Sequence, residues 1–576
     1  MVIMSDFGDI PTPTITTHPI LQPEMTYYSF DTTATPTRHV WFAWLLFTVV
    51  WFVSIGHNPL IHPDEGRYAT ISLGMLQSGD WITPRLNGLL YFEKPALPYW
   101  LGAIFFHLLG PTELAARLWP ALAGFLSIVA VALTARRLWG PEAGHYAGFV
   151  MGSSCWVMAN SHFLNLDTSL TFFMTLALCG FLLAQREDAG LAARRNWMWV
   201  CWAAMAAAVL SKGLIGIVIP GAVLVIYSLI LRQFFFWRRL HLLSGTVLFL
   251  VLCAPWFVLV SMRNPGFAHF FFIHEHFERF LTTEHHRAGP WWYFVPLLLA
   301  GFLPWTTLLA PLLLQGLRRE GRSALLQIDR LLLIWAVFVF AFFSASGSKL
   351  PSYILPMFPA LALLAGHYLV HVRPGTFARH LILPALTWVT LFVLDSFVSH
   401  WQSPDVPLAV LRHLAGYTAI GALVFMLGTA CAWRFLALER KLPAVIAVSL
   451  ASLVALTLVL DGYAPYAELK SARNIVATLH PDADTEVFSV RFYDQTLPFY
   501  LGRNVTLVDY VDEFQLGEQT EPQRWIPTLD GFITRWRAAH KAQAIMGEDT
   551  YNELKQRGLP MTVVYHDPRR MIVAKP

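Results

Sequence analysis

Charged residues are scarce in this sequence: Asp, Glu, Lys and Arg make up 14% of the 576 residues, whereas 56% are hydrophobic. A soluble globular chain carries about a quarter charged residues, so this composition excludes that class. The five cysteines all lie inside apolar runs, which argues against a disulfide framework or a thiolate metal site. The sequence also lacks a glycine-rich phosphate loop and a basic, aromatic-studded patch, so no nucleotide cofactor and no nucleic-acid partner is expected.

Long apolar runs dominate what is present. Stretches of about twenty apolar residues, each long enough to cross the hydrocarbon core of a bilayer, recur along most of the chain. They lie near 41–58, 96–112, 117–136, 143–162, 168–184, 197–211, 213–231, 241–262, 291–316, 329–345, 351–371, 380–399, 413–433 and 442–461. The sequence therefore predicts a polytopic α-helical membrane protein.

The basic residues predict its orientation. They cluster after several of the runs, at 136–137, 194–195, 238–239, 318–322, 373–379 and 434–441. The positive-inside rule places such clusters in the cytoplasm, and they all lie there only if the run at 96–112 does not cross. That run is short, has Pro95 and Pro98 at its start and contains His107, so we expect an interfacial or re-entrant helix against the outer leaflet. The result is about thirteen crossings, with the N-terminus inside and the C-terminus outside.

Three regions follow from this topology. Residues 1–37 are polar and rich in Thr and Pro, which predicts a disordered cytoplasmic tail. Residues 38–462 form the transmembrane domain, whose outer loops at 57–116 and 263–290 carry many of its polar side chains. The sequence pattern of residues 463–576 predicts an external α/β domain. Its patterns predict helices at 468–480 and 541–557, strands at 486–490 and 505–510, and a hairpin from 561–565 and 571–574. We find no catalytic constellation in this last domain.

The richest motif is His62-Pro63-Asp64-Glu65-Gly66-Arg67-Tyr68, directly after the first apolar run. It places two carboxylates, an arginine and a tyrosine at the outer membrane surface. Ionisable groups at such a position are costly unless they have a partner or a function. Pro63 and the two acids suit the first turn of a short helix, so capping of that helix is the alternative explanation.

Several motifs together resemble the ArnT-type glycosyltransferases, within the protein O-mannosyltransferase-like class that has the GT-C fold. The first outer loop carries most of them: Asp64 to Tyr68, Gly79-Asp80-Trp81 and Phe92-Glu93-Lys94-Pro95. The other two are Asn165-Leu166-Asp167 and the run from Ser348 to Pro356, Ser-Lys-Leu-Pro-Ser-Tyr-Ile-Leu-Pro. The resemblance covers about the first 370 residues in order. The C-terminal region is similar only in placement and size.

The resemblance implies a membrane glycosyltransferase that uses a sugar carried on a polyprenyl phosphate. Its best-known branch moves 4-amino-4-deoxy-L-arabinose from undecaprenyl phosphate to lipid A phosphates, which confers resistance to polymyxin-like cationic peptides. That branch implies the inner membrane of a Gram-negative bacterium, a site facing the periplasm, and membrane lipids as surroundings. The donor's lipid tail would lie in the bilayer and present its phosphate and sugar to the outer loops.

The expected site residues follow from charge and from the resemblance. A leaving polyprenyl phosphate requires cations and hydroxyl donors. The candidates for donor binding are Arg67, Tyr68, Arg85, Tyr91, Lys94, Lys212, Lys349 and Tyr353. Interfacial lysines that only reach toward the membrane surface, aromatic-belt tyrosines and a turn lysine at Lys212 are the alternatives.

Asp64 stands at the family's position for the catalytic carboxylate, and Asp167 is a second candidate. For a hydroxyl acceptor, Asp64 would act as general base. A lipid A phosphate is already ionised, so Asp64 would there orient the acceptor, bind a cation or contact the amino group of the sugar. Asp167 at a helix start also suits an ordinary helix cap.

A histidine-rich segment could hold a divalent cation. It runs His274-Glu275-His276-Phe277-Glu278-Arg279 and is followed by Glu284-His285-His286. Imidazole and carboxylate groups are ordinary metal ligands, and Glu93 with His274 is the expected pair if the two outer loops meet. A solvated interfacial helix explains the same residues.

Two rival functions remain open at this stage. An enzyme of the same fold could use another sugar or a protein hydroxyl acceptor, as in O-mannosyl transfer. A non-catalytic transporter of lipid-linked sugars should instead show inverted repeats and polar residues at the middle of several spans. The polar residues of this chain gather at one surface, which favours a transferase.

Overall fold

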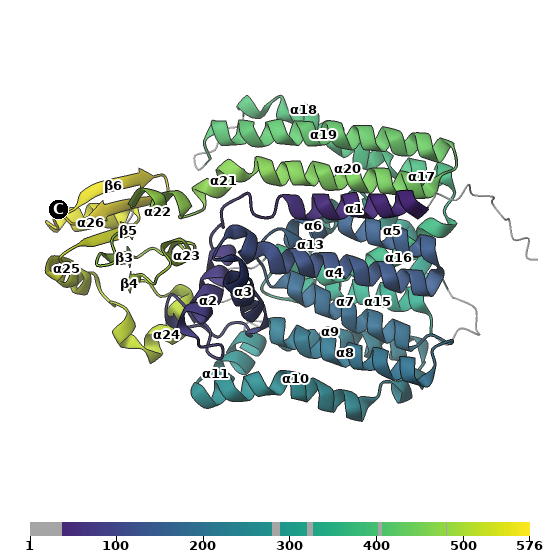
Figure 1. Cartoon of the computed structure of the whole chain (residues 1–576), viewed down its shortest axis with the longest axis horizontal. Helices are drawn as coiled ribbons and strands as arrows, with labels where there is room; N and C mark the ends of the chain where they lie inside the picture. The colour runs from purple at the N-terminus through teal and green to yellow at the C-terminus, as the bar shows by residue number, and fades with distance from the viewer. Residues whose placement is uncertain (1–36, 279–288, 319–325, 401–405, 480) are drawn as a thin grey trace, which may run out of the picture. The chain divides into compact units, whose positions relative to one another are not determined.

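The computed structural model describes residues 37–278, 289–318, 326–400, 406–479 and 481–576. The predicted tail, residues 1–37, lies outside this part except for Thr37. Helices account for most of the chain up to residue 462 (Figure 1). They are α1 (Thr37–Val53), α2 (Asp64–Ser78), α3 (Leu97–Leu109), α4 (Glu113–Trp139), α5 (Pro141–Ser153), α6 (Cys155–Ser161), α7 (Asp167–Ala184), α8 (Leu191–Lys212), α9 (Ile215–Leu231), α10 (Leu242–Arg263), α11 (Phe267–His269), α13 (Phe294–Gly301), α14 (Leu309–Leu317), α15 (Ile328–Ala345), α16 (Phe358–His371), α17 (Pro374–His380), α18 (Ile382–Asp395), α19 (Leu408–Ala437) and α20 (Lys441–Gly462).

Short 3₁₀ and π segments join several of these helices. They are η1 (Phe235–Arg239), η2 (Phe270–Glu278), η3 (Thr306–Leu308), η4 (Pro351–Met357) and η5 (Val398–His400). The first outer loop also contains a two-stranded hairpin, β1 (Arg85–Leu86) paired with β2 (Leu89–Leu90). Pro63 precedes α2, and Asp64 and Glu65 occupy its first turn, where carboxylates suit the helix dipole. The predicted short helix after the first span is therefore present.

The chain is a multi-pass membrane protein. Within the described residues, eight helices are long and apolar enough to cross a bilayer, or nine if the bent pair α13 and α14 forms one span. Helices α1, α3 and α9 are apolar but shorter. The membrane fold class is confirmed, whereas the count of about thirteen crossings stays a prediction.

The segment expected to lie at the interface forms α3, which has 13 residues. At 1.5 Å per residue it is about 20 Å long, too short to cross the hydrocarbon core on its own. It packs beside α2 (Figure 1). Helices α2 and α3 thus form a small layer at one end of the membrane helices, and α4 follows directly.

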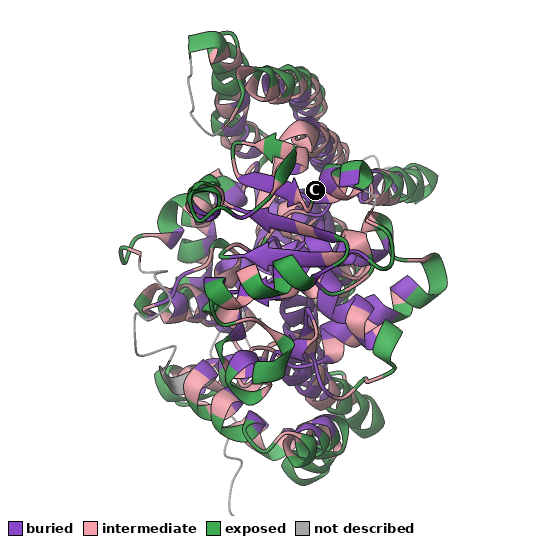
Figure 2. Ribbon diagram, turned by 90° about the vertical axis from the view of Figure 1, so that its left-hand side faces the viewer, coloured by how far each residue is buried: buried purple, intermediate pink, exposed green. Residues whose placement is uncertain are grey.

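The C-terminal region contains a five-stranded sheet in the order β4-β3-β5-β7-β6. Strand β3 pairs in parallel with β4 and β5, and β7 is antiparallel to β5 and β6. Strands β3, β4, β5 and β7 are largely buried, whereas the edge strand β6 is mostly exposed (Figure 2). The elements of this region are α21 (Ala464–Leu469), α22 (Arg473–Leu479), β3 (Glu486–Val490), α23 (Leu497–Leu501), β4 (Thr506–Val508), η6 (Asp512–Phe514), α24 (Gln515–Thr520), η7 (Pro522–Arg524), α25 (Leu529–Ala538), β5 (Ala542–Met546), α26 (Glu548–Gln556), β6 (Thr562–Asp567) and β7 (Arg570–Ala574).

Two helix predictions for this region require correction. The expected helix at 541–557 is strand β5 followed by α26, and the expected helix at 468–480 is divided into α21 and α22. Strand β5 runs Ala-Gln-Ala-Ile-Met between β3 and β7, with four of its five residues buried. A strand buried on both faces loses the alternating pattern that distinguishes it from a helix. The strand at 486–490 and the hairpin around Asp567 are confirmed.

The α2 helix packs closely against the C-terminal domain at Gly66. A Cβ atom built on Gly66 would lie 2.5 Å from the carbonyl carbon of Gln495, and it would also meet the backbone nitrogen of Thr496. No real Cβ atom fits at such a distance. The glycine in the first-loop motif is therefore the point where the backbone of one domain approaches the backbone of the other.

Candidate functional site: a charged pocket beneath the C-terminal domain

Asp64 and Glu65, adjacent in the sequence, have opposite environments. The Asp64 side chain is 48% exposed, and its Oδ1 accepts a hydrogen bond from Arg67 Nη1 at 2.6 Å. The Glu65 side chain is 3% exposed. Consecutive helical residues point about 100° apart, so only one of the two can face the pocket. Asp64 is the available carboxylate, and Glu65 is a structural one.

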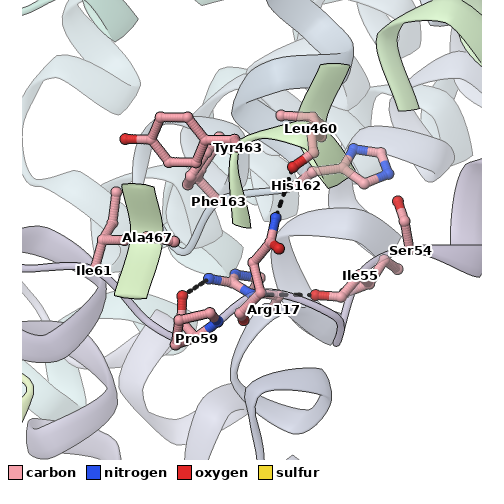
Figure 3. Close-up of a pocket in the computed structure, with 11 residues that line it drawn as sticks. Ser54, Ile55, Pro59, Ile61, Arg117, His162, Phe163, Leu460, Tyr463 and Ala467 are labelled. Carbon is pink, nitrogen blue, oxygen red and sulfur yellow. Dashed lines mark hydrogen bonds between the residues drawn. The ribbon is translucent and has the colours of Figure 1, made fainter. Parts of the chain in front are cut away.

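Glu65 forms a buried ion pair with Arg117 of α4. The contacts are bidentate, Nε to Oε1 and Nη2 to Oε2, both at 2.7 Å. Arg117 also donates to the carbonyl oxygens of Pro59 at 2.8 Å and Ile55 at 3.3 Å (Figure 3). Glu65 in turn accepts the backbone N–H of Leu164, just before α7. This network joins α2, α4 and the approach to α7, and it fixes the position of the neighbouring Asp64.

Arg67 lies between Asp64 and Glu513, a carboxylate of the C-terminal domain. Its Nε donates to Glu513 Oε2, and the side chains of Arg67 and Glu513 are 10% and 5% exposed. Gln495 Nε2 donates to the other oxygen of Glu513 at 2.8 Å. Burial raises the pKa of Glu513 above its ordinary value, and the Arg67 charge opposes that shift. Sequence reasoning missed Glu513; the run Tyr510-Val511-Asp512-Glu513-Phe514 was the only available signal.

Asp167 and Lys212 form a second cluster. Asp167 at the start of α7 is paired through Oδ1 with Lys212 Nζ, at the end of α8, and its Oδ2 accepts the Ser352 hydroxyl at 2.9 Å. Lys212 Nζ also lies 4.4 Å from the centre of the Tyr353 ring, a cation–π distance. The capping function falls to Asn165, whose Oδ1 accepts the N–H of Thr168 at 2.9 Å. Asp167 is thus not used as the helix cap.

Lys94 connects the two outer loops. Its Nζ donates to Glu275 Oε2 at 2.9 Å and lies 3.9 Å from Glu93 Oε2. Glu275 is 2% exposed in its side chain, so the pair is well shielded from water. The described parts of loops 57–116 and 263–290 therefore meet at this contact, which is the condition on which the predicted Glu93–His274 pair depends.

These groups face one pocket. It is lined by Asp64, Arg67, Tyr68, Glu93, Lys94, Asn165, Leu166, Asp167, Lys212, Leu350, Ser352 and Tyr353. Both candidate catalytic carboxylates and five of the candidate donor-binding residues are among them. Burial strongly raises the pKa of Tyr68, as does the Asp64 charge, so its hydroxyl stays a neutral hydrogen-bond donor.

Three candidate donor-binding residues do not line the pocket. Arg85 donates to both carboxylate oxygens of Glu521, at 2.8 and 3.0 Å, and so attaches the β1–β2 hairpin to the C-terminal domain. Lys349 Nζ donates to the carbonyl oxygen of Ser346 at 2.5 Å. Tyr91 is buried nearby, and burial together with the Glu93 charge raises the pKa of its hydroxyl. The hydrogen-bond partners of Arg85 and Lys349 and the burial of Tyr91 were not evident from the local sequence.

The metal pair Glu93 and His274 stays a prediction. Among the described residues there is no group of three or more His, Cys, Asp or Glu side chains close enough to hold a metal ion. Glu275, adjacent to His274, is paired with Lys94. Residues 279–288, which include Arg279, Glu284, His285 and His286, lie outside the described part.

Comparison with known proteins defines the class. Residues 39–271 match the family model for dolichyl-phosphate-mannose-protein mannosyltransferase, and residues 472–575 match that for the aminoarabinose transferase C-terminal domain. The fold is also that of the crystal structure of ArnT from Cupriavidus metallidurans bound to undecaprenyl phosphate, with a TM-score of 0.89 at 39% identity over 94% of this chain and 98% of that one. The chain is a multi-pass membrane glycosyltransferase of the GT-C type.

Named relatives identify the family of this chain within that class. The undecaprenyl phosphate-alpha-4-amino-4-deoxy-L-arabinose arabinosyl transferase of Erwinia tasmaniensis is 30% identical over 421 residues, 70% of this chain and 74% of that protein. The enzyme of the same name from Pseudomonas aeruginosa strain UCBPP-PA14 is 35% identical over 338 residues, and the match spans 60% of its length. The chain belongs to this family, the ArnT arabinosyl transferases.

Proposed function

We propose that this protein transfers 4-amino-4-deoxy-L-arabinose from undecaprenyl phosphate to a phosphate group of lipid A. One observation carries the proposal: a single pocket at the end of the membrane helices is lined by three carboxylates, Asp64, Glu93 and Asp167, and three cations, Arg67, Lys94 and Lys212. The names of the relatives and the undecaprenyl phosphate of the Cupriavidus structure support the donor.

The cations suit a phosphate leaving group. Transfer breaks the bond between the anomeric carbon of the sugar and the phosphate oxygen of the donor, and the electron pair leaves with undecaprenyl phosphate. We assign Arg67 and Lys94 to stabilising that developing charge, because fixed cations in a partly buried site interact strongly with an anion. Tyr68 adds a neutral hydroxyl donor.

The carboxylates suit the rest of the substrate. An acceptor phosphate oxygen is already ionised and bonds to the anomeric carbon without losing a proton, so Asp64 needs no base function there. We assign Asp64 to holding the amino group of the sugar or orienting the acceptor. With a protein hydroxyl acceptor, Asp64 would have to take the proton.

We place the enzyme in the inner membrane of a Gram-negative bacterium with its pocket toward the periplasm. The predicted positive-inside topology and the lipid-borne donor support this side. The added amino sugar brings a positive charge to lipid A and offsets a phosphate charge there. Attraction of polymyxin-like cationic peptides to the outer surface is thereby weakened.

The test uses purified protein in lipid vesicles with undecaprenyl-phosphate aminoarabinose and lipid A, and mass spectrometry detects the product. Wild type should add one aminoarabinose, and Asp64→Asn should reduce the rate by at least about a hundredfold if this charge contacts the reacting groups. Asp80→Asn is the matched control, because Asp80 lies in the same outer loop but does not line the pocket. It should retain activity.

The other outcomes are equally informative. Full activity of Asp64→Asn would remove that residue from the reaction. A folded wild-type protein that binds the donor and yields no lipid A product would disprove the acceptor and favour another sugar or a protein hydroxyl.

A further inference from the structure

A hollow of about 530 Å³ lies at the ends of α4 and α7 that are remote from the pocket. It is lined by Leu133, Arg136, Arg137, Pro141 and Arg186. We call it the arginine hollow. Three of its five lining residues are arginines, and none of the five lines the charged pocket described above.

The arginine hollow is on the opposite membrane face from that site. Helix α4 begins at Glu113, which accepts a hydrogen bond from Tyr500 of the C-terminal domain, and ends at Trp139. Its 27 residues span about 40 Å at 1.5 Å per residue, the thickness of a bilayer with its headgroups. The arginines at its far end therefore lie at headgroup level.

The guanidinium groups are available for a ligand. Arg136 and Arg137 are exposed, and neither has an ion pair or side-chain hydrogen bond within the described part of the chain. Among the residues that the structure describes, Arg186 has one ion pair, with Asp188, whose side chain is 67% exposed, and such exposed pairs are weak. Arg194 differs: it donates to the carbonyl oxygen of Ala184, the last residue of α7, and to that of Ala189 in the loop that follows.

An apolar wall continues the hollow toward the bilayer. Leu133 is 55% exposed and lies one helical turn before Arg137, on the same side of α4. A ligand that fits must therefore combine an anion with an adjacent hydrocarbon chain. Glu142 and Glu187 are exposed nearby but do not line the hollow.

We propose that the arginine hollow binds the headgroup of an anionic membrane phospholipid. Its phosphodiester would lie among Arg136, Arg137 and Arg186, since guanidinium groups bind phosphate oxygens in a bidentate fork. Its acyl chain would pass along Leu133. A phospholipid and free phosphate both present a phosphoryl anion to the three arginines. Only the phospholipid also has an acyl chain that can contact the apolar wall.

Native mass spectrometry of the full-length protein, stripped of lipid in detergent, tests this. Dioleoyl-phosphatidylglycerol is titrated against dioleoyl-phosphatidylcholine, which has the same chains but no net charge. Wild type should prefer the anionic lipid, and each Arg→Gln change should weaken its binding roughly fivefold, so that the triple variant Arg136→Gln/Arg137→Gln/Arg186→Gln loses about a hundredfold.

Two further variants control for charge and folding. The triple variant Arg379→Gln/Arg434→Gln/Arg440→Gln removes the same charge from exposed residues outside the hollow and should bind as wild type does. The triple Arg→Lys variant of the hollow keeps the charge but loses the bidentate fork, so it should retain only part of the preference and bind the anionic lipid more tightly than the triple Gln variant does.

Four results would overturn the proposal. They are equal retention of the two lipids by wild type, unchanged binding in the triple Gln variant, equal loss in the control variant, and inorganic phosphate displacing the lipid at equal concentration. The last would identify a site for free phosphate. The transfer reaction is not involved, so the proposed function stands or fails independently.

Discussion

At the residue scale, the pocket depends on pairs in which one charged side chain holds another in place. Glu65 and Arg117 compensate each other in a buried environment, so the backbone that carries Asp64 is fixed without a contact from Asp64 itself. Two comparable pairs connect the outer loop to the C-terminal domain: Arg67 with Glu513, and Arg85 with Glu521. Only the first includes a pocket residue.

This difference allows a matched experiment. Glu513→Gln should leave the fold intact and reduce the transfer rate by about tenfold or more, because a charge-assisted hydrogen bond to Arg67 is lost. Glu521→Gln removes an equivalent interdomain pair and should leave the rate nearly unchanged. The transfer rate of both variants is measured as a function of donor concentration. The KM for the donor should rise only in Glu513→Gln. Equal rates in the two variants would show that Glu513 serves docking alone.

At the element scale, α2 is the joint between the membrane helices and the C-terminal domain. It carries Asp64 and Arg67 at its start, packs on α3 along its length, and meets the backbone of residues 495–496 at Gly66. Such a close backbone approach leaves no volume for a larger side chain.

Gly66→Ala should therefore separate the two domains. The added methyl group cannot fit against Gln495, so we expect poor folding or a strongly reduced transfer rate. Gly74→Ala, in the same helix, is the control, because the nearest atom to its Cβ would be Arg85 O at 3.8 Å, an ordinary contact. Limited proteolysis of the C-terminal domain measures the separation. If both variants resist protease as wild type does, the close approach at Gly66 is incorrect.

The loop before α2 should make the docked state sensitive to acid. Burial, and then the charge of Arg569, lower the pKa of His62 to about 4, whereas an exposed histidine titrates near 6.5. The folded protein thus keeps His62 neutral, and its contribution to stability is complete above pH 6.5. Below that pH the unfolded chain binds the proton more readily, so this stability is lost progressively down to about pH 4.

Thermal unfolding midpoints measured between pH 7.5 and pH 4 test whether stability falls with pH. Wild type should lose stability as the pH falls, and His62→Gln should lose less over the same interval. His566→Gln, which replaces an exposed histidine of the C-terminal domain, should behave as wild type does. A wild-type midpoint that rises toward pH 4 would reverse the prediction.

Features that depend on neighbouring residues could be predicted from the sequence, whereas contacts between residues far apart in the chain could not. Helix α2, strand β3 and the β6–β7 hairpin follow from local patterns, and the structure contains them. Strand β5 did not follow, because burial on both faces removed its periodicity. The Arg67–Glu513 pair joins residues 446 positions apart, and no local pattern carries such information. The donor-binding role of Arg85 and Lys349 stays a prediction, and their partners Glu521 and Ser346 were not visible in the local sequence.

At the scale of the whole molecule, the two charged regions lie at opposite ends of the same helices. The charged pocket is at the start of α7, and the arginine hollow is at the far ends of α4 and α7. The topology predicted from the positive-inside rule assigns these ends to the periplasm and the cytoplasm.

Labelling tests this assignment directly. In a cysteine-free protein, Glu93→Cys and Arg137→Cys should react with a membrane-impermeant maleimide from opposite sides of inner-membrane vesicles. The first residue lines the pocket and the second lines the hollow. Labelling of both from one side would invalidate the topology, and with it the periplasmic position of the pocket.

The Arg67–Glu513 contact also bears on how the protein is made. A ribosome releases Arg67 early and Glu513 close to the end, so the pocket lacks one of its charged partners throughout most of synthesis. In the topology predicted from the positive-inside rule, the Glu513 carboxylate crosses the membrane before it docks on Arg67. A chain truncated before residue 513 would contain all the membrane helices described here, the last of which ends at Gly462, and would still lack this ion pair.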